Sequence, residues 1–140
     1  MGVTIFATNS SYSFDMGYGG FFNLRKNIAL AMDKEFGENY ACIAFCHTEE
    51  DYTVNDKMSK SIITRKHLDK RYGDILDFLY ASDEGGKTTH KTCLNIYNLI
   101  KNIDFGRKGF RYAAYRHNDY EEFKKFLREC YSKHRKMRWK

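Results

Sequence analysis

None of the 140 residues is proline, although an average usage of about 5% would give about seven. This absence excludes proline-rich linkers, polyproline recognition segments and turns built on a cis proline. The chain also lacks an apolar run that approaches the roughly 18 residues of a membrane-spanning helix. Its first six residues have neither a charged start nor a long apolar stretch, so we expect no signal peptide. We therefore expect one compact domain over residues 1–140 and no membrane partner.

The chain contains four cysteines. Because no signal peptide is expected, they are expected to be reduced thiols in the cytosol of a bacterial host. His90 and Cys93 have a spacing that places both on one helix face, as do Cys130 and His134. The sequence shows no further tight pair beside either of them, whereas a structural zinc site needs four ligands. We therefore expect no metal and no cofactor.

Charge is abundant but unevenly distributed. Hydrophobic residues at 42% and charged residues at 30% are typical of a folded protein. Residues 101–140 contain 13 Lys and Arg against 5 Asp and Glu, a net +8, whereas residues 1–100 contain 11 against 13, a net −2. Such asymmetry favours a nucleic acid, a phosphorylated ligand or an acidic protein as partner. The alternative interpretation is a solvated basic face that aids solubility.

The hydrophobic pattern predicts an α+β fold. Residues 3–7 are rich in strand formers, Asn9–Ser11 is typical of a turn, and residues 12–16 alternate apolar and polar side chains, which together predict a β-hairpin. We expect this N-terminal hairpin, with 136–139 as a candidate third strand, to pack on four to five helices. Helical spacing covers residues 21–37, 56–72, 89–103 and 119–131, residues 40–46 fit helix or strand, and 49–55 are expected to form a surface loop.

The segment Ala81–Thr88 combines glycines with Lys87 before an expected helix. Backbone N–H groups of such glycine-rich loops can cradle a phosphate while a lysine neutralises it. Ala81 stands at the first glycine position, and two acidic residues would lie beside the phosphates. We therefore expect a helix-to-helix turn in which Gly85 or Gly86 has a positive φ, and no catalytic residue.

Residues Lys108–Tyr115 interleave aromatic and basic side chains. They resemble the octapeptide of RNA-recognition motifs at five of its seven specified positions, and Ile5–Ser10 resembles the partner hexapeptide. In that family such aromatics stack on bases and Arg or Lys bind phosphates. About a hundred residues separate the two segments here, where the family has one helix and one strand. We therefore carry over the surface chemistry as an expectation, and not the fold.

Three short motifs resemble those of small phage, prophage and bacterial accessory proteins. They are Gly17-Tyr18-Gly19-Gly20-Phe21 with Leu24-Arg25, Ser82-Asp83-x-x-Gly86 with Cys93, and Phe123-x2-Phe126-Leu127-x2-Cys130 before a short strand. The resemblance implies an accessory protein that acts in host takeover or counter-defence. It implies no catalytic residue.

These observations predict a non-enzymatic protein that captures an anionic, base-bearing ligand, concretely a nucleotide second messenger of bacterial immunity. Aromatic side chains would stack on the base and basic ones would hold phosphate, and a homo-oligomer would enclose the ligand. The expected ligand-binding residues are Tyr18, Lys87, Arg107, Lys108, Arg111, Tyr112, Tyr115 and Arg116. Two alternatives stay open. One is binding of RNA or single-stranded DNA through residues 105–116, and the other is inhibition of an acidic host defence protein.

Overall fold

The computed structural model describes residues 2–44, 49–107, 109–110 and 117–140. Four strands form one sheet: β1 (Gly2–Ala7), β2 (Ser13–Gly17), β3 (Gly86–Thr88) and β4 (Met137–Trp139). The described helices are α1 (Tyr18–Met32), α2 (Lys34–Ala44), α3 (Glu49–Lys66), α4 (Leu68–Tyr80), α5 (His90–Ile100) and α6 (His117–Ser132). The expected α+β fold is therefore confirmed.

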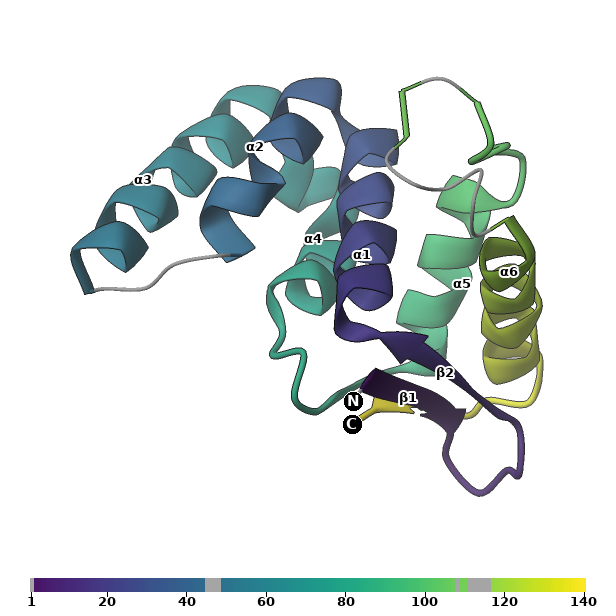
Figure 1. Ribbon diagram of the computed structural model, residues 1–140. Helices are drawn as coiled ribbons and strands as arrows, with labels where there is room; N and C mark the ends of the chain where they lie inside the picture. Colours follow the sequence, from purple (N-terminus) through teal and green to yellow (C-terminus); the bar gives the residue numbers. More distant parts are fainter. Residues whose placement is uncertain (1, 45–48, 108, 111–116) are drawn as a thin grey trace.

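The sheet has the order β2-β1-β4-β3, and all neighbours are antiparallel. β1 and β2 form the expected hairpin, in which Val3 pairs with Met16 and Ile5 with Phe14. β4 pairs with the other edge of β1, so the expected contribution of a C-terminal strand is also confirmed. This pairing brings the two ends of the chain side by side in the centre of the sheet (Figure 1).

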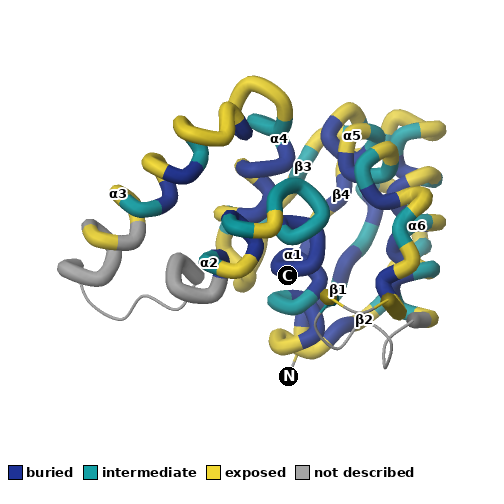
Figure 2. Tube along the Cα trace, turned by 90° about the horizontal axis from the view of Figure 1, so that it is seen from above, coloured by how far each residue is buried: buried dark blue, intermediate teal, exposed yellow. Residues whose placement is uncertain are grey.

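The two faces of the sheet differ in burial. Helices α1, α4, α5 and α6 lie on one side, and the opposite side carries none of the described helices (Figure 1). Strand residues alternate between the faces, so every second residue of β1 and β4 is buried against the helices (Figure 2). The inward residues are Val3, Ile5, Ala7, Met16, Met137 and Trp139, each at most 2% exposed. Their outward neighbours are left at the surface.

The helices begin and end at residues that differ from the expected ones. The expected loop over 49–55 is wrong, because these residues form the first turns of α3. The first expected helix ends at Met32, because the Asp33 carboxylate accepts the Phe36 N–H at 3.0 Å and so starts α2. α3 and α4 are separated at His67, whose φ of 54° is a left-handed conformation that a helix interior does not accept.

The loop after α4 also differs from expectation. Gly86–Thr88 forms the short edge strand β3 rather than part of a turn, and Lys87 pairs with Arg138 of β4. Neither Gly85 nor Gly86 has a positive φ. Gly86 is instead required by close packing, because a Cβ there would lie 2.3 Å from Cζ2 of the buried Trp139. Thr89 then caps α5, accepting the Thr92 N–H at 3.3 Å.

Two helical glycines provide a matched test of the packing between α1 and α2. A Cβ at Gly37 would lie 2.5 Å from the Leu30 Cα, whereas a Cβ at Gly73 would have no neighbour within 4 Å. We expect Gly37→Ala to destabilise the fold by about 1–3 kcal/mol, because the two helix backbones must separate. Gly73→Ala should instead stabilise it by about 0.5–1 kcal/mol through helix propensity. Urea unfolding of both variants measures this difference, and equal effects would contradict the packing.

Candidate functional site

The structure describes three of the eight expected ligand-binding residues. Tyr18 begins α1 and is 39% exposed, Lys87 is exposed in β3, and Arg107 is exposed beyond the end of α5. Lys87 and Arg107 flank opposite ends of α5, whose 11 residues span about 16 Å, so these two do not share one site. The other expected residues are Lys108, Arg111, Tyr112, Tyr115 and Arg116, and they lie outside the described residues.

Lys87 belongs to a different group of residues, the outward face of the sheet. One row across the strands runs from Ser13 of β2 through Phe6 of β1 and Arg138 of β4 to Lys87 of β3. The next row contains Asp15, Thr4 and Lys140, in which Thr4 and Lys140 exchange two backbone hydrogen bonds of 2.8 and 3.1 Å. Lys136 extends the face beyond β4, where its carbonyl oxygen accepts the Thr8 N–H at 3.0 Å. We call these residues together with Thr8 the outer face.

The chemistry of the outer face changes from one edge to the other. The Asp15 carboxylate on β2 is the acidic group and accepts the Thr4 hydroxyl at 2.6 Å. β1 contributes the half-buried Phe6, and β4 and β3 contribute the cations. Lys87 and Arg138 are directly opposed cross-strand neighbours, an arrangement of like charges that lowers the stability of a sheet. Positive charge is therefore concentrated on one half of the face.

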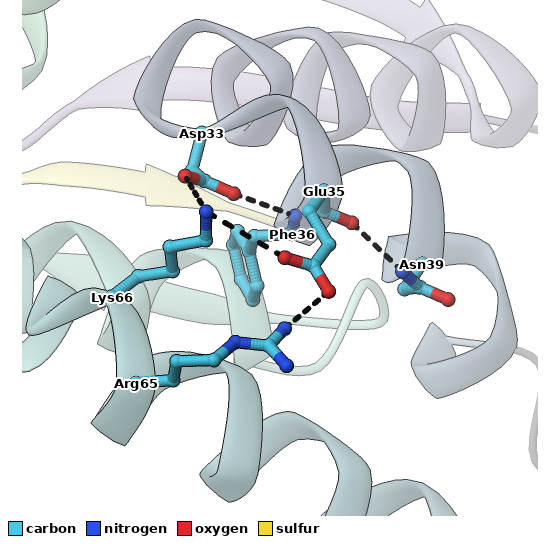
Figure 3. A network of polar contacts seen from close by, with 6 residues as sticks. All are labelled: Asp33, Glu35, Phe36, Asn39, Arg65 and Lys66. Atoms are coloured by element: carbon cyan, nitrogen blue, oxygen red, sulfur yellow. Dashed lines mark hydrogen bonds and ion pairs between the residues drawn. The ribbon is translucent and has the colours of Figure 1, made fainter.

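The cations of the outer face lack the acidic partners found elsewhere in the molecule. On α3, Arg65 and Lys66 form ion pairs with Glu35, and the Lys66 Nζ also lies 3.9 Å from the Asp33 carboxylate (Figure 3). Lys124 and Lys133 pair with glutamates of α6. In contrast, no carboxylate among the described residues forms an ion pair with the cations of the outer face, Lys87, Lys136, Arg138 and Lys140.

Phe6 is the aromatic residue of the outer face, and two of the cations lie beside its ring. The Arg138 guanidinium carbon is 5.6 Å and the Lys140 Nζ 5.5 Å from the ring centroid, within the range of a cation–π interaction. Both cationic side chains are exposed, while the ring is half-buried. An aromatic ring between unpaired cations can stack on a planar base and bind its phosphates at the same time.

A buried arginine supports the outer face from the inner side. Arg25 of α1 is 5% exposed and donates hydrogen bonds to the carbonyl oxygens of Leu79, Ala81 and Ser82, the last at 3.2 Å. These carbonyls end α4 and begin the loop that leads to β3. The guanidinium carbon also lies 4.2 Å from the Phe21 ring centroid. Arg25 thereby replaces hydrogen bonds that the last turn of α4 cannot make within the helix.

Two further buried side chains hold the same loop. The indole N–H of Trp139 donates to the Ser82 carbonyl at 2.7 Å, and the Tyr40 hydroxyl donates to the Leu79 carbonyl at 2.6 Å. Burial raises the pKa of Tyr40 to about 12, while the nearby Arg25 charge acts in the opposite direction. Tyr40 is therefore a neutral donor at physiological pH. Because Trp139 is also a residue of β4, the loop before Lys87 is attached directly to the sheet.

The two cysteine–histidine pairs meet at one end of the α5–α6 pair. The His90 and His134 rings stack with centroids 4.7 Å apart, and Cys93 and Cys130 are free, fully buried thiols. A hydrogen bond to Cys130, followed by burial, raises the pKa of Cys93 well above its ordinary value. The thiol is therefore protonated, whereas metal ligation and nucleophilic attack use the thiolate. Within the described part of the chain, no group of three or more His, Cys, Asp or Glu side chains could hold a metal ion.

Comparisons with known proteins found no matching family model, curated protein or solved structure. The expected relation to phage and prophage proteins stays a prediction, as do the expected cytosolic location and homo-oligomer. Of the helices in the described ranges, none is both long and apolar enough to cross a bilayer.

Sequence reasoning missed most of the outer face. It selected Lys87 for the glycine-rich loop and noted Phe6 within a short resemblance, but it assigned no role to Lys136, Arg138 or Lys140. The sequence contains a signal for these cations, because they alternate with Met137 and Trp139 over residues 136–140, which include the expected strand 136–139. Such alternation places the three cations on one face of a strand.

Proposed function

We propose that this protein binds nucleotide units through the outer face of its sheet. In this proposal Phe6 stacks on a base, and Arg138, Lys140 and Lys87 bind phosphate oxygens. The protein acts by holding its ligand and not by transforming it. The observation that carries the proposal is the half-buried Phe6 ring beside two exposed cations that have no acidic partner among the described residues.

The energetics favour a ligand with both a base and a phosphate. Hydrogen bonds from cations to phosphate oxygens are charge-assisted and about twice as strong as neutral ones. Stacking of a base on an aromatic side chain contributes about 1–3 kcal/mol. In the free protein Arg138 and Lys140 lie beside the Phe6 ring. A ligand that draws both cations toward its phosphates uncovers the ring for its base.

The proposal shares its ligand chemistry with the predicted capture of a nucleotide second messenger, but it uses a different set of residues. Lys87 belongs to both sets. Tyr18 belongs only to the predicted set, since it begins α1 and has no place in the rows of the outer face. The two aromatic residues Phe6 and Tyr18 therefore distinguish the two sites.

Substitution of Phe6 tests the proposal. We expect Phe6→Ala to weaken binding of a labelled oligouridylate of about 12 nucleotides by about tenfold or more, because the stacking contribution is lost. Phe6→Tyr keeps the ring and should bind like the wild type, whereas Phe6→Leu keeps only apolar volume and should resemble the alanine variant. Fluorescence anisotropy gives the affinities.

Tyr18→Ala is the matched control. It removes an exposed aromatic residue that is not part of the outer face and should leave the affinity unchanged. Loss of binding in Tyr18→Ala but not in Phe6→Ala would overturn the proposal in favour of the site expected from the sequence. Absence of any oligonucleotide or nucleotide binding by the wild type would overturn it outright.

A further inference from the structure

We infer that the occupant of the outer face is a single strand of RNA or DNA lying along β4, with its phosphates over β4 and β3 and its bases over β1. This inference rests on the proposed function and names the ligand class for the same face. It is carried by the spacing of the cations, by the openness of the face and by the order of charges across the strands.

The cations extend further than one nucleotide requires. Lys136, Arg138 and Lys140 stand at alternate positions along one strand direction, so about 13 Å separates the first from the last at about 3.3 Å per residue. Lys87 adds a fourth cation across the neighbouring strand β3. A single phosphate group can satisfy one or two of these side chains. Several successive phosphates of one strand can satisfy all four.

The face is also open. Its cations are exposed, and the described helices lie on the opposite side of the sheet (Figure 1). Sites for small molecules are usually concave and bury about 70–90% of the ligand surface. A sheet face of this kind buries little of a free nucleotide. A strand gains affinity instead by repeating the same contacts along its length, as in other proteins that bind single strands through a basic surface with aromatic residues.

The order of charges across the sheet sets the orientation of the strand. Asp15 on β2 repels phosphates, and Arg138 and Lys87 on β4 and β3 attract them. Phe6 on β1 lies between these two regions, so it meets the bases. The bases must be unpaired to stack on a half-buried ring, because the faces of bases inside a duplex are already stacked. The charge order therefore favours a single strand over a duplex.

A comparison of ligands tests the inference. The probes are uridine monophosphate, a linear diuridylate, a cyclic dinucleotide, a labelled oligouridylate of about 12 nucleotides and a duplex of equal length, all measured with the wild-type chain. We expect the oligouridylate to bind at least tenfold more tightly than the monophosphate and either dinucleotide, and more tightly than the duplex. A monophosphate or cyclic dinucleotide that binds as tightly as the oligouridylate would overturn the inference while leaving the proposed function intact. Equal affinity for the duplex would also overturn it.

Variants of Asp15 and Lys136 on the outer face test the orientation of the bound nucleic-acid strand. Asp15→Asn removes the repulsive charge and should raise the affinity for the oligouridylate about two- to threefold, since one screened charge is lost. Lys136→Glu should lower the affinity for the oligouridylate and leave that for the monophosphate unchanged. Lys57→Glu is the control, because it makes the same charge change on α3, away from the sheet (Figure 1). Equal losses for Lys57→Glu and Lys136→Glu would overturn the proposed path of the strand.

Discussion

Replacement of Arg25 by alanine is expected to lower the free energy of unfolding by about 3 kcal/mol or more. The guanidinium group is buried and donates to three carbonyl oxygens at and just after the end of α4. Once it is removed, the Leu79 and Ser82 carbonyls keep the Tyr40 hydroxyl and the Trp139 indole as donors, whereas the Ala81 carbonyl loses its donor. The contacts of the guanidinium group with the rings of Phe21, Phe78 and Trp139 are lost as well. Thermal and urea unfolding measure the effect.

Two further variants separate the causes of this loss. Arg25→Met keeps most of the side-chain volume but none of the donors, so it should remain destabilised by about 2 kcal/mol through the Ala81 carbonyl, which loses its donor. Arg128→Ala removes an exposed arginine of α6 and should change stability by no more than about 0.5 kcal/mol. An Arg25→Met variant as stable as the wild type would show that these hydrogen bonds do not stabilise the fold.

The second large effect is expected for binding. The double variant Arg138→Glu with Lys140→Glu should weaken oligouridylate binding by about 100-fold or more, because two charge-assisted contacts of about 1.5–3 kcal/mol each are replaced by repulsion. Both side chains lie beside Phe6, so the base position is affected together with the phosphate positions. Anisotropy titration of the wild type and the double variant measures the loss.

The same substitution should not weaken the fold. Arg138 directly opposes Lys87, so a glutamate at position 138 converts a like-charge pair into an opposite-charge pair. Such a change stabilises a sheet by about 0.2–1 kcal/mol. Lost binding in a variant at least as stable as the wild type cannot result from unfolding. The double control Lys57→Glu with Lys70→Glu makes an equal charge change at exposed positions of α3 and α4, and it should retain binding. Equal loss in the control would attribute binding to net charge alone.

The sheet was the most predictable part of the fold. β1 is rich in strand formers, and apolar and polar residues alternate in β2 and β4 because one face of the sheet is buried, so these strands can be predicted without the structure. β3 could not be predicted in this way, because its three residues Gly86–Thr88 carry no strand pattern. The strand exists because these residues pair with β4 and because Gly86 fits against the Trp139 ring.

The helix boundaries were less predictable for a different reason. The break between α3 and α4 occurs at His67, and histidine adopts the left-handed conformation more often than most residues but too rarely to predict a break. The acidic start of α3 was expected to be a loop because it is strongly polar. Acidic residues are in fact favourable in the first turn of a helix. Polarity alone therefore does not distinguish a loop from an exposed helix end.

The candidate site depends on strand order, which the sequence shows poorly. Phe6 and Arg138 are separated by most of the chain and become neighbours only because β4 lies beside β1. Lys87 joins them through the unexpected strand β3. The excess of positive charge in residues 101–140 was evident from the sequence. The placement of three of these cations, Lys136, Arg138 and Lys140, on the outer face follows from the sheet topology.

The salt dependence of oligouridylate binding tests the central proposal most directly. If the four cations Lys87, Lys136, Arg138 and Lys140 each bind one phosphate of a single strand, the slope of log affinity against log salt should be about −3, and each cation removed should reduce it by about 0.7. Arg138→Ala should therefore give a shallower slope, and Lys57→Ala the wild-type slope. A slope near zero for the wild type, or one unchanged by Arg138→Ala, would contradict binding of a nucleic-acid strand on the outer face.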